Sequence, residues 1–172
     1  MEEIVKNAVT KVEEYRLKKY HCSESSIRAC SEALNIKLSD DIIRIASGFR
    51  GGGGGYGDRC GILESGIMLV ALLYGRDHSG IDVSSYSYLI RLLHDRFNEE
   101  LGGYYCRNLR PFAYRVSGEE QDCSYVYRKG AEIVARLLAD ADRLIREMPE
   151  TEMYGKSPMR PFEHIPTEDD EA

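Results

Sequence analysis

Apolar residues recur every three or four positions along most of this chain, and this period constrains the fold more than any other feature. In the segment 2–20 the apolar positions include Ile4, Ala8, Val12 and Tyr15. Such spacing places side chains on one face of an α-helix. Strand patterns are few, and a weak alternation at 112–116 is the best candidate. The sequence therefore predicts an all-α fold.

Capping and breaking residues divide the pattern into a bundle of five to six helices. Ser and Asp can cap helix beginnings, and Gly often follows helix ends. Pro111 lacks a backbone N–H, so the segment 104–121 is expected to be irregular. The segment near 59–75 is apolar on most sides and is expected to be a buried central helix, whose apolar residues include Ile62, Leu69, Leu72 and Leu73. The other expected helices cover 2–20, a segment around 27–34, 41–47, 84–100 and 122–148.

Length and charge limit the organisation and the function classes. The 172 residues suffice for one domain, expected to be a helical, cysteine-containing domain over 1–148 followed by an extended or disordered acidic tail over 149–172. The net charge of −6, without clusters of Lys and Arg, argues against nucleic-acid binding. The longest apolar run, "IMLVALLY", is far shorter than the roughly 20 residues of a membrane span. We expect a cytoplasmic protein without a membrane span.

The glycine run Gly51–Gly55, within "GFRGGGGGYGDRCG", has three possible interpretations. No Lys-Ser or Lys-Thr follows it, which excludes a P-loop. A dinucleotide-binding fingerprint is disfavoured because no alternation of strands and helices surrounds it. The run is then either a flexible connection or a loop that lies against a bulky group or presents several N–H groups to an anion or to sulfur.

The five cysteines are Cys22, Cys30, Cys60, Cys106 and Cys123. Their odd number and the absence of CxxC argue against a disulfide framework, a zinc ribbon and a thioredoxin motif. Cys60 and Cys123 fall in expected first turns of helices, where unpaired N–H groups favour a thiolate, and Arg59 could strengthen this effect at Cys60. Cys22 falls at a helix junction and Cys106 in the irregular stretch. Cys30 lies in an apolar stripe and is interpreted as a packing residue.

The order of these features resembles the C_GCAxxG_C_C family of putative redox-active proteins over about residues 5–140. The features are Cys22, the glycine-rich "GFRGGGGGYGDRCG", the apolar "IMLVALLYG", "YYCRNL" and a last cysteine. The resemblance implies that Cys22, Cys60, Cys106 and Cys123 are the characteristic cysteines and that Gly61 is the glycine after the motif cysteine. The chain departs from the family pattern at Ile62, where the family has alanine, and at Ser65, where it has glycine; Gly66 follows one step later.

Three functions follow as hypotheses. In the first, Cys22, Cys60, Cys106 and Cys123 are both the redox-active and the metal-binding residues, and they hold an iron–sulfur cluster or zinc for electron transfer. Gly51, Gly52, Gly53, Gly54, Gly55 and Gly61 would lie against this cofactor, with loop N–H groups donating to its sulfurs.

In the second hypothesis, one thiolate attacks a disulfide or an oxidant and a neighbouring cysteine resolves the product, without a metal. In the third, the cysteines are inert and the helices form a partner-binding surface. His21 could ligate a metal or activate a thiol, and Glu64 could tune Cys60. A redox partner protein and a homodimer are the expected partners.

Overall fold

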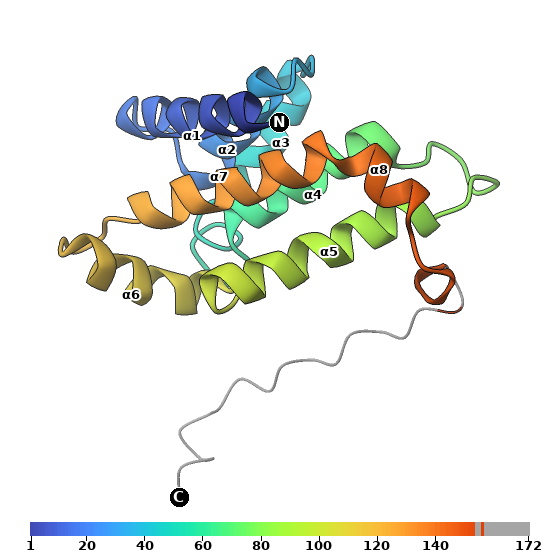
Figure 1. Ribbon diagram of the computed structural model, residues 1–172. Coiled ribbons are helices and arrows are strands. Elements are labelled where there is room, and N and C mark those ends of the chain that lie inside the picture. The colour runs from blue at the N-terminus through green and yellow to red at the C-terminus, as the bar shows by residue number, and fades with distance from the viewer. Residues whose placement is uncertain (154–155, 157–172) are drawn as a thin grey trace, which may run out of the picture.

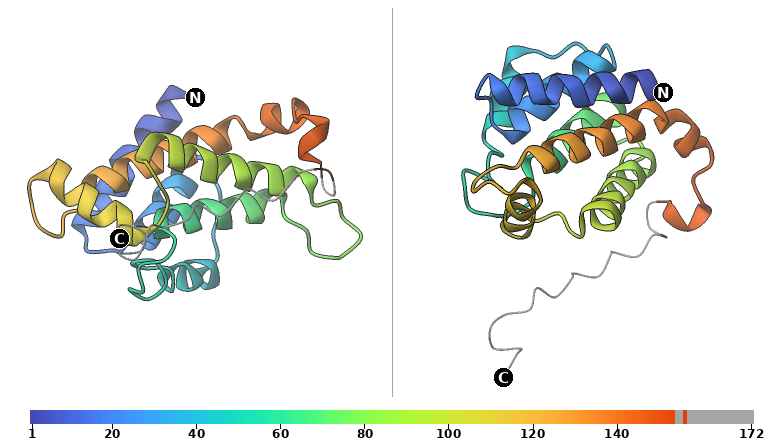
Figure 2. Two further views of the ribbon diagram at one scale, coloured as in Figure 1. Left: turned by 90° about the horizontal axis from the view of Figure 1, so that it is seen from below. Right: turned by 60° about the vertical axis from the view of Figure 1, so that its left-hand side comes forward.

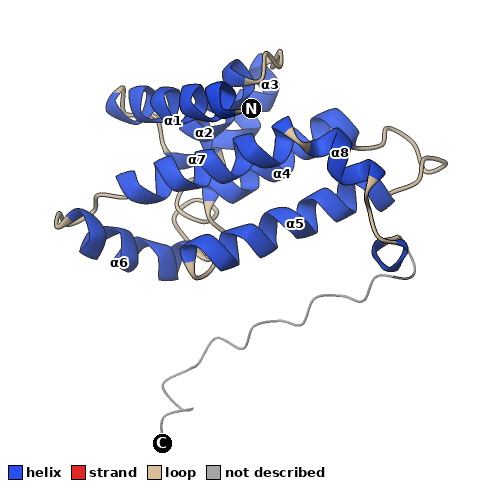
Figure 3. Ribbon diagram, in the orientation of Figure 1, coloured by secondary structure: helices blue, strands red, loops and turns tan. Residues whose placement is uncertain are grey.

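Helices account for the regular structure of this protein, as Figures 1 and 3 show. The computed structural model describes residues 1–153 and residue 156, and that part of the chain contains no strand. Its eight α-helices are α1 Glu2–Leu17, α2 Cys22–Ala33, α3 Asp40–Ser47, α4 Gly61–Tyr74, α5 Ser84–Leu101, α6 Cys106–Ser117, α7 Ser124–Ala139 and α8 Ala141–Arg146, followed by the 3-10 helix η1 Glu150–Glu152. The all-α prediction is confirmed, whereas the predicted count of five to six helices is too low.

The helices pack around α4 and α7. Helix α1 lies against α2 and α7, while α4 contacts α2 on one side and α5 on the other. Figure 2 shows this arrangement from two further directions. Helix α7 lies at the centre because it is amphipathic and one of its faces is apolar. The small and branched residues buried on this helix include Val126, Gly130, Ala131, Ile133, Val134, Leu137 and Leu138. No helix in the described residues is long and apolar enough to cross a membrane.

Helix α4 is buried through its first half, as predicted for a central helix. Every residue from Gly61 to Gly66 is buried, as are Leu69 and Val70. The prediction was wrong for Leu72 and Leu73, which are 43% and 45% exposed. These two residues lie in the last turn of α4, where the helix leaves the bundle before the loop that leads to α5.

Two glycines allow α4 to pack closely against its neighbours. A Cβ atom on Gly130 of α7 would lie 2.8 Å from Cγ2 of Ile62, so α7 has no side chain where Ile62 projects. A Cβ on Gly66 would lie 2.8 Å from both Leu93 and Val134. The side chain of Ile62 is therefore accommodated by the missing side chain at Gly130.

The stretch predicted to be irregular forms helix α6. Pro111 lies in its second turn and is exposed, so its ring points away from the bundle. The inner face of α6 buries Cys106, Leu109 and Ala113. Their packing offsets the loss of the intrahelical hydrogen bond that Pro111 cannot donate. Gly118 ends the helix with a left-handed φ of 75°. The single long helix predicted for 122–148 is likewise divided at Asp140 into α7 and α8.

The tail predicted for 149–172 falls largely on 154–155 and 157–172, which lie outside the described residues. Within the described part, Glu150–Glu152 forms η1. Arg91 of α5 holds this turn, because its Nε lies 2.9 Å from Oε2 of Glu152 and a second guanidinium nitrogen donates to the Glu152 carbonyl.

Candidate functional site

Four of the five cysteines lie at the N-termini of four different helices. Cys22 and Cys106 are the first residues of α2 and α6, and Cys60 and Cys123 immediately precede α4 and α7. Backbone N–H groups without intrahelical partners concentrate at such ends and favour negative charge. The predicted helix-end positions are confirmed, but Cys106 begins a helix rather than lying in an irregular stretch.

These four cysteines line one cavity of about 550 Å³. Its apolar wall includes Ile62, Leu109 and Val126, and tyrosines also contribute to the lining. Cys60 and Cys106 are 4% and 6% exposed, whereas Cys22 and Cys123 are only partly buried. The structure thus brings together side chains that are spread over most of the sequence.

A short backbone pairing holds Cys60 beside Cys106. The N–H of Cys60 donates to the carbonyl of Tyr104 at 2.8 Å, and the N–H of Cys106 donates to the carbonyl of Asp58 at 2.7 Å. Between these two bonds, Arg59 and Tyr105 form an isolated antiparallel bridge. The segment that ends the glycine loop therefore also fixes the beginning of α6.

Gly61 allows α2 and α4 to approach at their N-termini. A Cβ atom at this position would lie 2.7 Å from Sγ of Cys22 and 2.8 Å from the carbonyl oxygen of Phe49. Distances this short exclude any side chain without displacement of the cysteine or the backbone. The glycine after Cys60 is therefore a requirement for placing the Cys22 sulfur against the start of α4.

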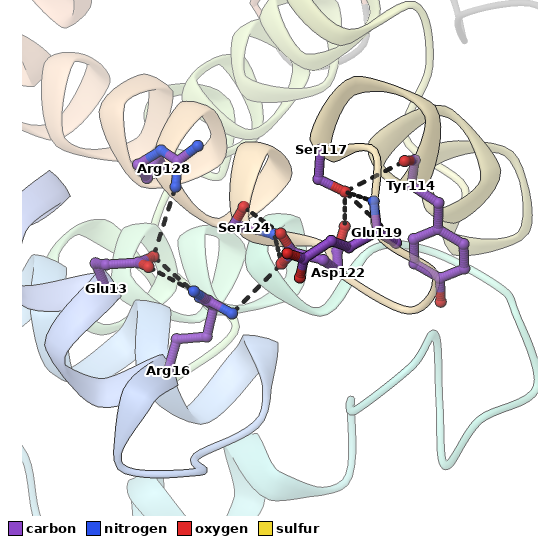
Figure 4. A network of polar contacts seen from close by, with 8 residues as sticks. All are labelled: Glu13, Arg16, Tyr114, Ser117, Glu119, Asp122, Ser124 and Arg128. Carbon is purple, nitrogen blue, oxygen red and sulfur yellow. Dashed lines mark hydrogen bonds and ion pairs between the residues drawn. The ribbon is translucent and has the colours of Figure 1, made fainter.

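Polar contacts join α1 and the end of α6 to Asp122 and Ser124 at the start of α7, as Figure 4 shows. These two residues flank Cys123 in the sequence. The carboxylate of Asp122 accepts hydrogen bonds from the N–H and the hydroxyl of Ser124, both at 2.8 Å. Arg16 of α1 lies 3.3 Å from Asp122 and also pairs with Glu13. Ser117, at the end of α6, donates to the Asp122 carbonyl at 3.4 Å.

The glycine run forms a left-handed coil that is closed by its own backbone. Gly51–Gly55 all have positive φ, between 61° and 97°. The N–H groups of Gly53, Gly54 and Gly55 donate to carbonyls of residues 48–50, and those of Gly57 and Asp58 donate to Gly51 and Gly52. The expectation that this loop directs several N–H groups at sulfur is wrong for these five donors. The hydrogen bonds explain why the sequence needs glycine here, because only glycine adopts this conformation repeatedly without strain.

The predicted cofactor glycines are therefore divided. Gly51 and Gly55 line the cysteine cavity, whereas Gly52 and Gly53 line a second, separate depression. Gly61 contacts the cysteine group through its close approach to Cys22.

Burial dominates the ionisation of the cavity thiols. Burial raises the pKa of Cys123 to about 11, with negative charge at Cys106 adding to the rise and Arg110 opposing it. Burial also raises the pKa of Cys60 and the pKa of Cys106, and negative charge at Cys22 is the second largest cause of both increases. The expectation that helix N-termini favour the thiolate forms of Cys60 and Cys123 is therefore wrong for the free thiols, because burial has the larger effect on the pKa of both.

The polar neighbours expected to tune Cys60 face elsewhere. Nε of Arg59 lies 2.7 Å from Oε1 of Glu64, and both residues line the second depression beyond the glycine loop. Glu64 is only 8% exposed, and burial raises its pKa while Arg59 opposes this rise. His21 lines the cysteine cavity as an exposed residue, and its N–H donates to Oε2 of Glu24 at 3.0 Å.

Sequence reasoning missed two residues that share the cavity with the cysteines and interact with them electrostatically. Tyr127 lines the cavity one turn after Cys123, and burial together with the charge at Cys22 raises its pKa. Arg110 lies one turn after Cys106 and lowers the pKa of both Cys106 and Cys123 against the larger effect of burial. The spacing of four residues from a cysteine was the available signal in both cases.

The donor set limits which metal group the site could hold. Among the described residues, no three or more His, Cys, Asp or Glu side chains are arranged to hold one metal ion. The four cavity cysteines line an open volume and do not converge on the position of a single ion. They could ligate a polynuclear group, whose ligands bind different metal atoms.

Cys30 stands apart from this group, as predicted. It is fully buried between α2 and α7, where its Sγ lies 3.8 Å from the Ala131 carbonyl oxygen and 4.0 Å from Oγ of Ser26. Burial raises the pKa of Cys30 to about 12.

The chain is similar to known sequences over the part that contains this site. The family described as "Putative redox-active protein (C_GCAxxG_C_C)" matches residues 20–137, which include all four cavity cysteines. A relative from Archaeoglobus fulgidus, named "Uncharacterized protein", is 32% identical over 130 residues, covering 70% of this chain and 85% of the relative. No solved structure matches the chain.

Proposed function

The chain belongs to the family described as "Putative redox-active protein (C_GCAxxG_C_C)", and we propose that Cys22, Cys60, Cys106 and Cys123 bind an iron–sulfur cluster that transfers electrons. The observation that carries this proposal is the convergence of the four cysteines on one cavity from four helix N-termini. Four cysteine thiolates are the usual ligand set of [2Fe–2S] and [4Fe–4S] clusters. When bound, such a cluster supplies one-electron chemistry.

The state of the free thiols favours ligation over nucleophilic attack. A thiol that attacks disulfides at neutral pH benefits from a lowered pKa. Here burial raises the pKa of Cys60, Cys106 and Cys123. Coordination removes this obstacle, because a metal deprotonates a coordinating thiol outright.

The arrangement also favours a cluster over zinc. A structural zinc ion requires four ligands about 2.0–2.3 Å from one point. No three candidate donors of the described chain are arranged for one ion, whereas a cluster distributes its cysteine ligands over several irons. The cavity of about 550 Å³ leaves space between the sulfurs for such a group.

The surrounding residues offset the negative charge of the four thiolates and limit the access of water. Arg110 stabilises negative charge at Cys106 and Cys123. The four helix N-termini act in the same direction. Ile62, Leu109 and Val126 form an apolar wall, which lowers the local polarity and thereby influences the reduction potential.

A metal-free dithiol–disulfide function is the second candidate. The Cys22 sulfur lies so close to the start of α4 that a Cβ on Gly61 would be 2.7 Å away. Cys60 immediately precedes Gly61 at the same helix end, so Cys22 and Cys60 are the pair proposed to form the disulfide. In this case the cysteines would release two electrons to an oxidant as the S–S bond forms.

An electron-transfer role requires a redox partner protein, and free thiols are most easily maintained in a reducing, cytoplasmic compartment. A homodimer stays a further prediction, tested by the mass of the protein in solution.

The test is anaerobic purification or reconstitution with iron and sulfide, followed by a visible spectrum and by iron, sulfide and zinc analysis. The proposal expects sulfur-to-iron absorption bands and stoichiometric iron and sulfide that disappear on chelation. A colourless, metal-free protein that loses two free thiols on mild oxidation would support the dithiol function instead. Cysteines that bind no metal and resist oxidants would leave a partner-binding helical protein.

A further inference from the structure

The mouth of the cysteine cavity carries positive charge in an acidic protein. The chain has 29 acidic and 23 basic residues. Yet the residues lining the cavity include Arg16, Lys19, Arg50 and Arg110, and none of the lining residues is an aspartate or a glutamate. This local reversal of charge distinguishes the cavity from the composition of the chain as a whole.

Two of these cations are available to a ligand. Arg16 is occupied by Glu13 and Asp122. Lys19 and Arg50 are exposed, and neither forms an ion pair with another described residue. They come from separate segments, the turn between α1 and α2 and the start of the glycine loop, so the fold places both at one opening.

Arg110 connects this opening with the sulfurs. Its Nε donates to the hydroxyl of Tyr114 at 2.8 Å, which leaves other guanidinium N–H groups unused by that bond. Because Arg110 also lines the cavity and influences Cys106 and Cys123, a ligand bound to its free edge would lie near those thiols. Guanidinium groups bind carboxylates and other oxyanions through paired hydrogen bonds.

The deeper lining would suit an organic group. The lining also includes the partly buried Tyr20, Tyr114 and Tyr127 and the buried apolar side chains of Leu109 and Val126. Aromatic and apolar walls with a few fixed polar groups are typical of sites for small organic molecules.

We propose that the cavity binds a small organic anion, with its carboxylate or other oxyanion group held by Lys19, Arg50 and Arg110. The inference rests on the proposed function, because it assigns the substrate class of the same redox site. The bound molecule would lie with its organic part toward the sulfurs.

The test uses the cavity thiols of the reduced, metal-free protein as reporters, so its result does not depend on iron binding. An anionic aromatic disulfide, 5,5′-dithiobis(2-nitrobenzoate), and a neutral one, 2,2′-dithiodipyridine, are reacted with the protein. In each reaction a protein thiolate attacks the reagent disulfide, forms a mixed disulfide and releases an aromatic thiolate. The neutral reagent corrects for changes in thiolate fraction, and buried Cys30 is expected to stay unreacted in the folded protein.

The informative variant is Lys19→Glu/Arg50→Glu, and its matched control is Lys6→Glu/Arg76→Glu, which changes the net charge equally. Lys6 and Arg76 are exposed and do not line the cavity. We expect the ratio of anionic to neutral reaction rates to fall about tenfold in the first variant and to stay near that of wild type in the control. High salt should reduce the wild-type ratio.

An equal fall in both variants would assign the effect to net charge and overturn the proposal, as would an unchanged ratio in both. Benzoate should protect the wild-type thiols at lower concentration than benzamide, and the absence of this difference would also contradict an oxyanion site. If the protein binds no iron while these rate ratios change as expected, the anion-binding site is supported and the proposal of an iron–sulfur cluster is wrong.

Discussion

Cys30 and the four cavity cysteines occupy contrasting surroundings within the same bundle. Cys30 lies in the packed core, fully buried, with its sulfur near a backbone carbonyl of α7. Cys22, Cys60, Cys106 and Cys123 line an open volume, with helix N-termini behind them and cations at the mouth. The sulfur of Cys30 therefore packs as an apolar atom in the core. The sulfurs of the four cavity cysteines instead lie where helix N-termini and cations can stabilise negative charge.

The two regions also differ in how tightly they are packed. In the core, the side chain of Ile62 fits against Gly130, and Gly66 fits against Leu93 and Val134. At the cavity, close approaches occur where a Cβ on Gly61 would meet Cys22 and where a Cβ on Gly51 would meet Gly55. Substitutions in the core should thus change stability, while those around the cavity should change chemistry more than stability.

The largest loss of stability is expected from substitutions at the contact between Ile62, which also lines the cavity, and Gly130. Ile62→Ala should reduce the free energy of unfolding by about 2–5 kcal/mol, because it leaves a void. Gly130→Ala should cost about 1–3 kcal/mol through overlap with Ile62. Denaturant unfolding of the single and double variants measures both effects.

In the double variant the new Gly130→Ala methyl occupies part of the space that Ile62 leaves. We expect the double loss to be smaller than the sum of the two single losses by about 0.5–3 kcal/mol. Leu72→Ala is the control, since Leu72 is 43% exposed on the same helix. Strict additivity would show that Ile62 and Gly130 are not packing partners.

Gly61→Ala should be the substitution that damages both regions. Its Cβ would lie 2.7 Å from Sγ of Cys22, so the cysteine or the backbone must move. We expect a loss of about 1–3 kcal/mol in unfolding free energy together with loss of iron binding. Gly80→Ala, at which a Cβ would meet nothing within 4 Å, is the control and should behave as wild type. Full iron content in Gly61→Ala would contradict the role given to this close approach.

The buried thiol of Cys30 should make stability depend on pH. Burial raises the pKa of Cys30 to about 12, whereas an unfolded cysteine has a pKa of about 8.5. Because the unfolded chain releases the proton first, this contribution is fully present below about pH 8.5 and is lost as the pH rises toward the folded pKa.

We expect Cys30 to contribute a fall in unfolding free energy of about 1.4 kcal/mol per pH unit above about pH 9 in the reduced, metal-free protein. Denaturant unfolding at about pH 8 and about pH 10 measures this slope, and Cys30→Ala should remove that share of it. A variant with the wild-type slope would show that the Cys30 thiol titrates normally.

A smaller effect is expected from the contacts that hold the start of α7. Asp122→Ala removes the hydrogen bonds to Ser124 and the pair with Arg16, and should cost about 0.5–2 kcal/mol. Asp77→Ala is the control, because the Asp77 side chain is 91% exposed. Equal stability of the two variants in thermal unfolding would show that the Asp122 contacts add little.

The helical class could be predicted from the sequence because apolar periodicity follows directly from burial of one helix face. Helix α6 could not, because Pro111 indicates a break, and only the packing of Leu109 and Ala113 together with the backbone bonds at Cys106 offsets it. The sequence around each segment also gives no indication that the backbone of residues 57–60 forms hydrogen bonds with that of residues 104–107. That pairing is what brings Cys60 to Cys106.

The helix-end positions of the cysteines were predicted, but the ionisation of Cys60 and Cys123 was not. A helix N-terminus stabilises a nearby charge by about 0.3–1 kcal/mol, which is less than one pKa unit. Burial acts in the opposite direction and raises the pKa of Cys123 to about 11. The sequence indicates the helix end, whereas the depth of burial depends on the packing of the whole bundle.

Four of the five sulfurs are proposed to serve one centre, and the sulfur of Cys30 is not. Five single Cys→Ala variants, reconstituted anaerobically with iron and sulfide and checked for helical content by circular dichroism, test this proposal most directly. We expect Cys22→Ala, Cys60→Ala, Cys106→Ala and Cys123→Ala to lose most of the bound iron and the visible bands, while Cys30→Ala retains both. Equal iron content in all five folded variants, or a loss confined to Cys30→Ala, would contradict the account.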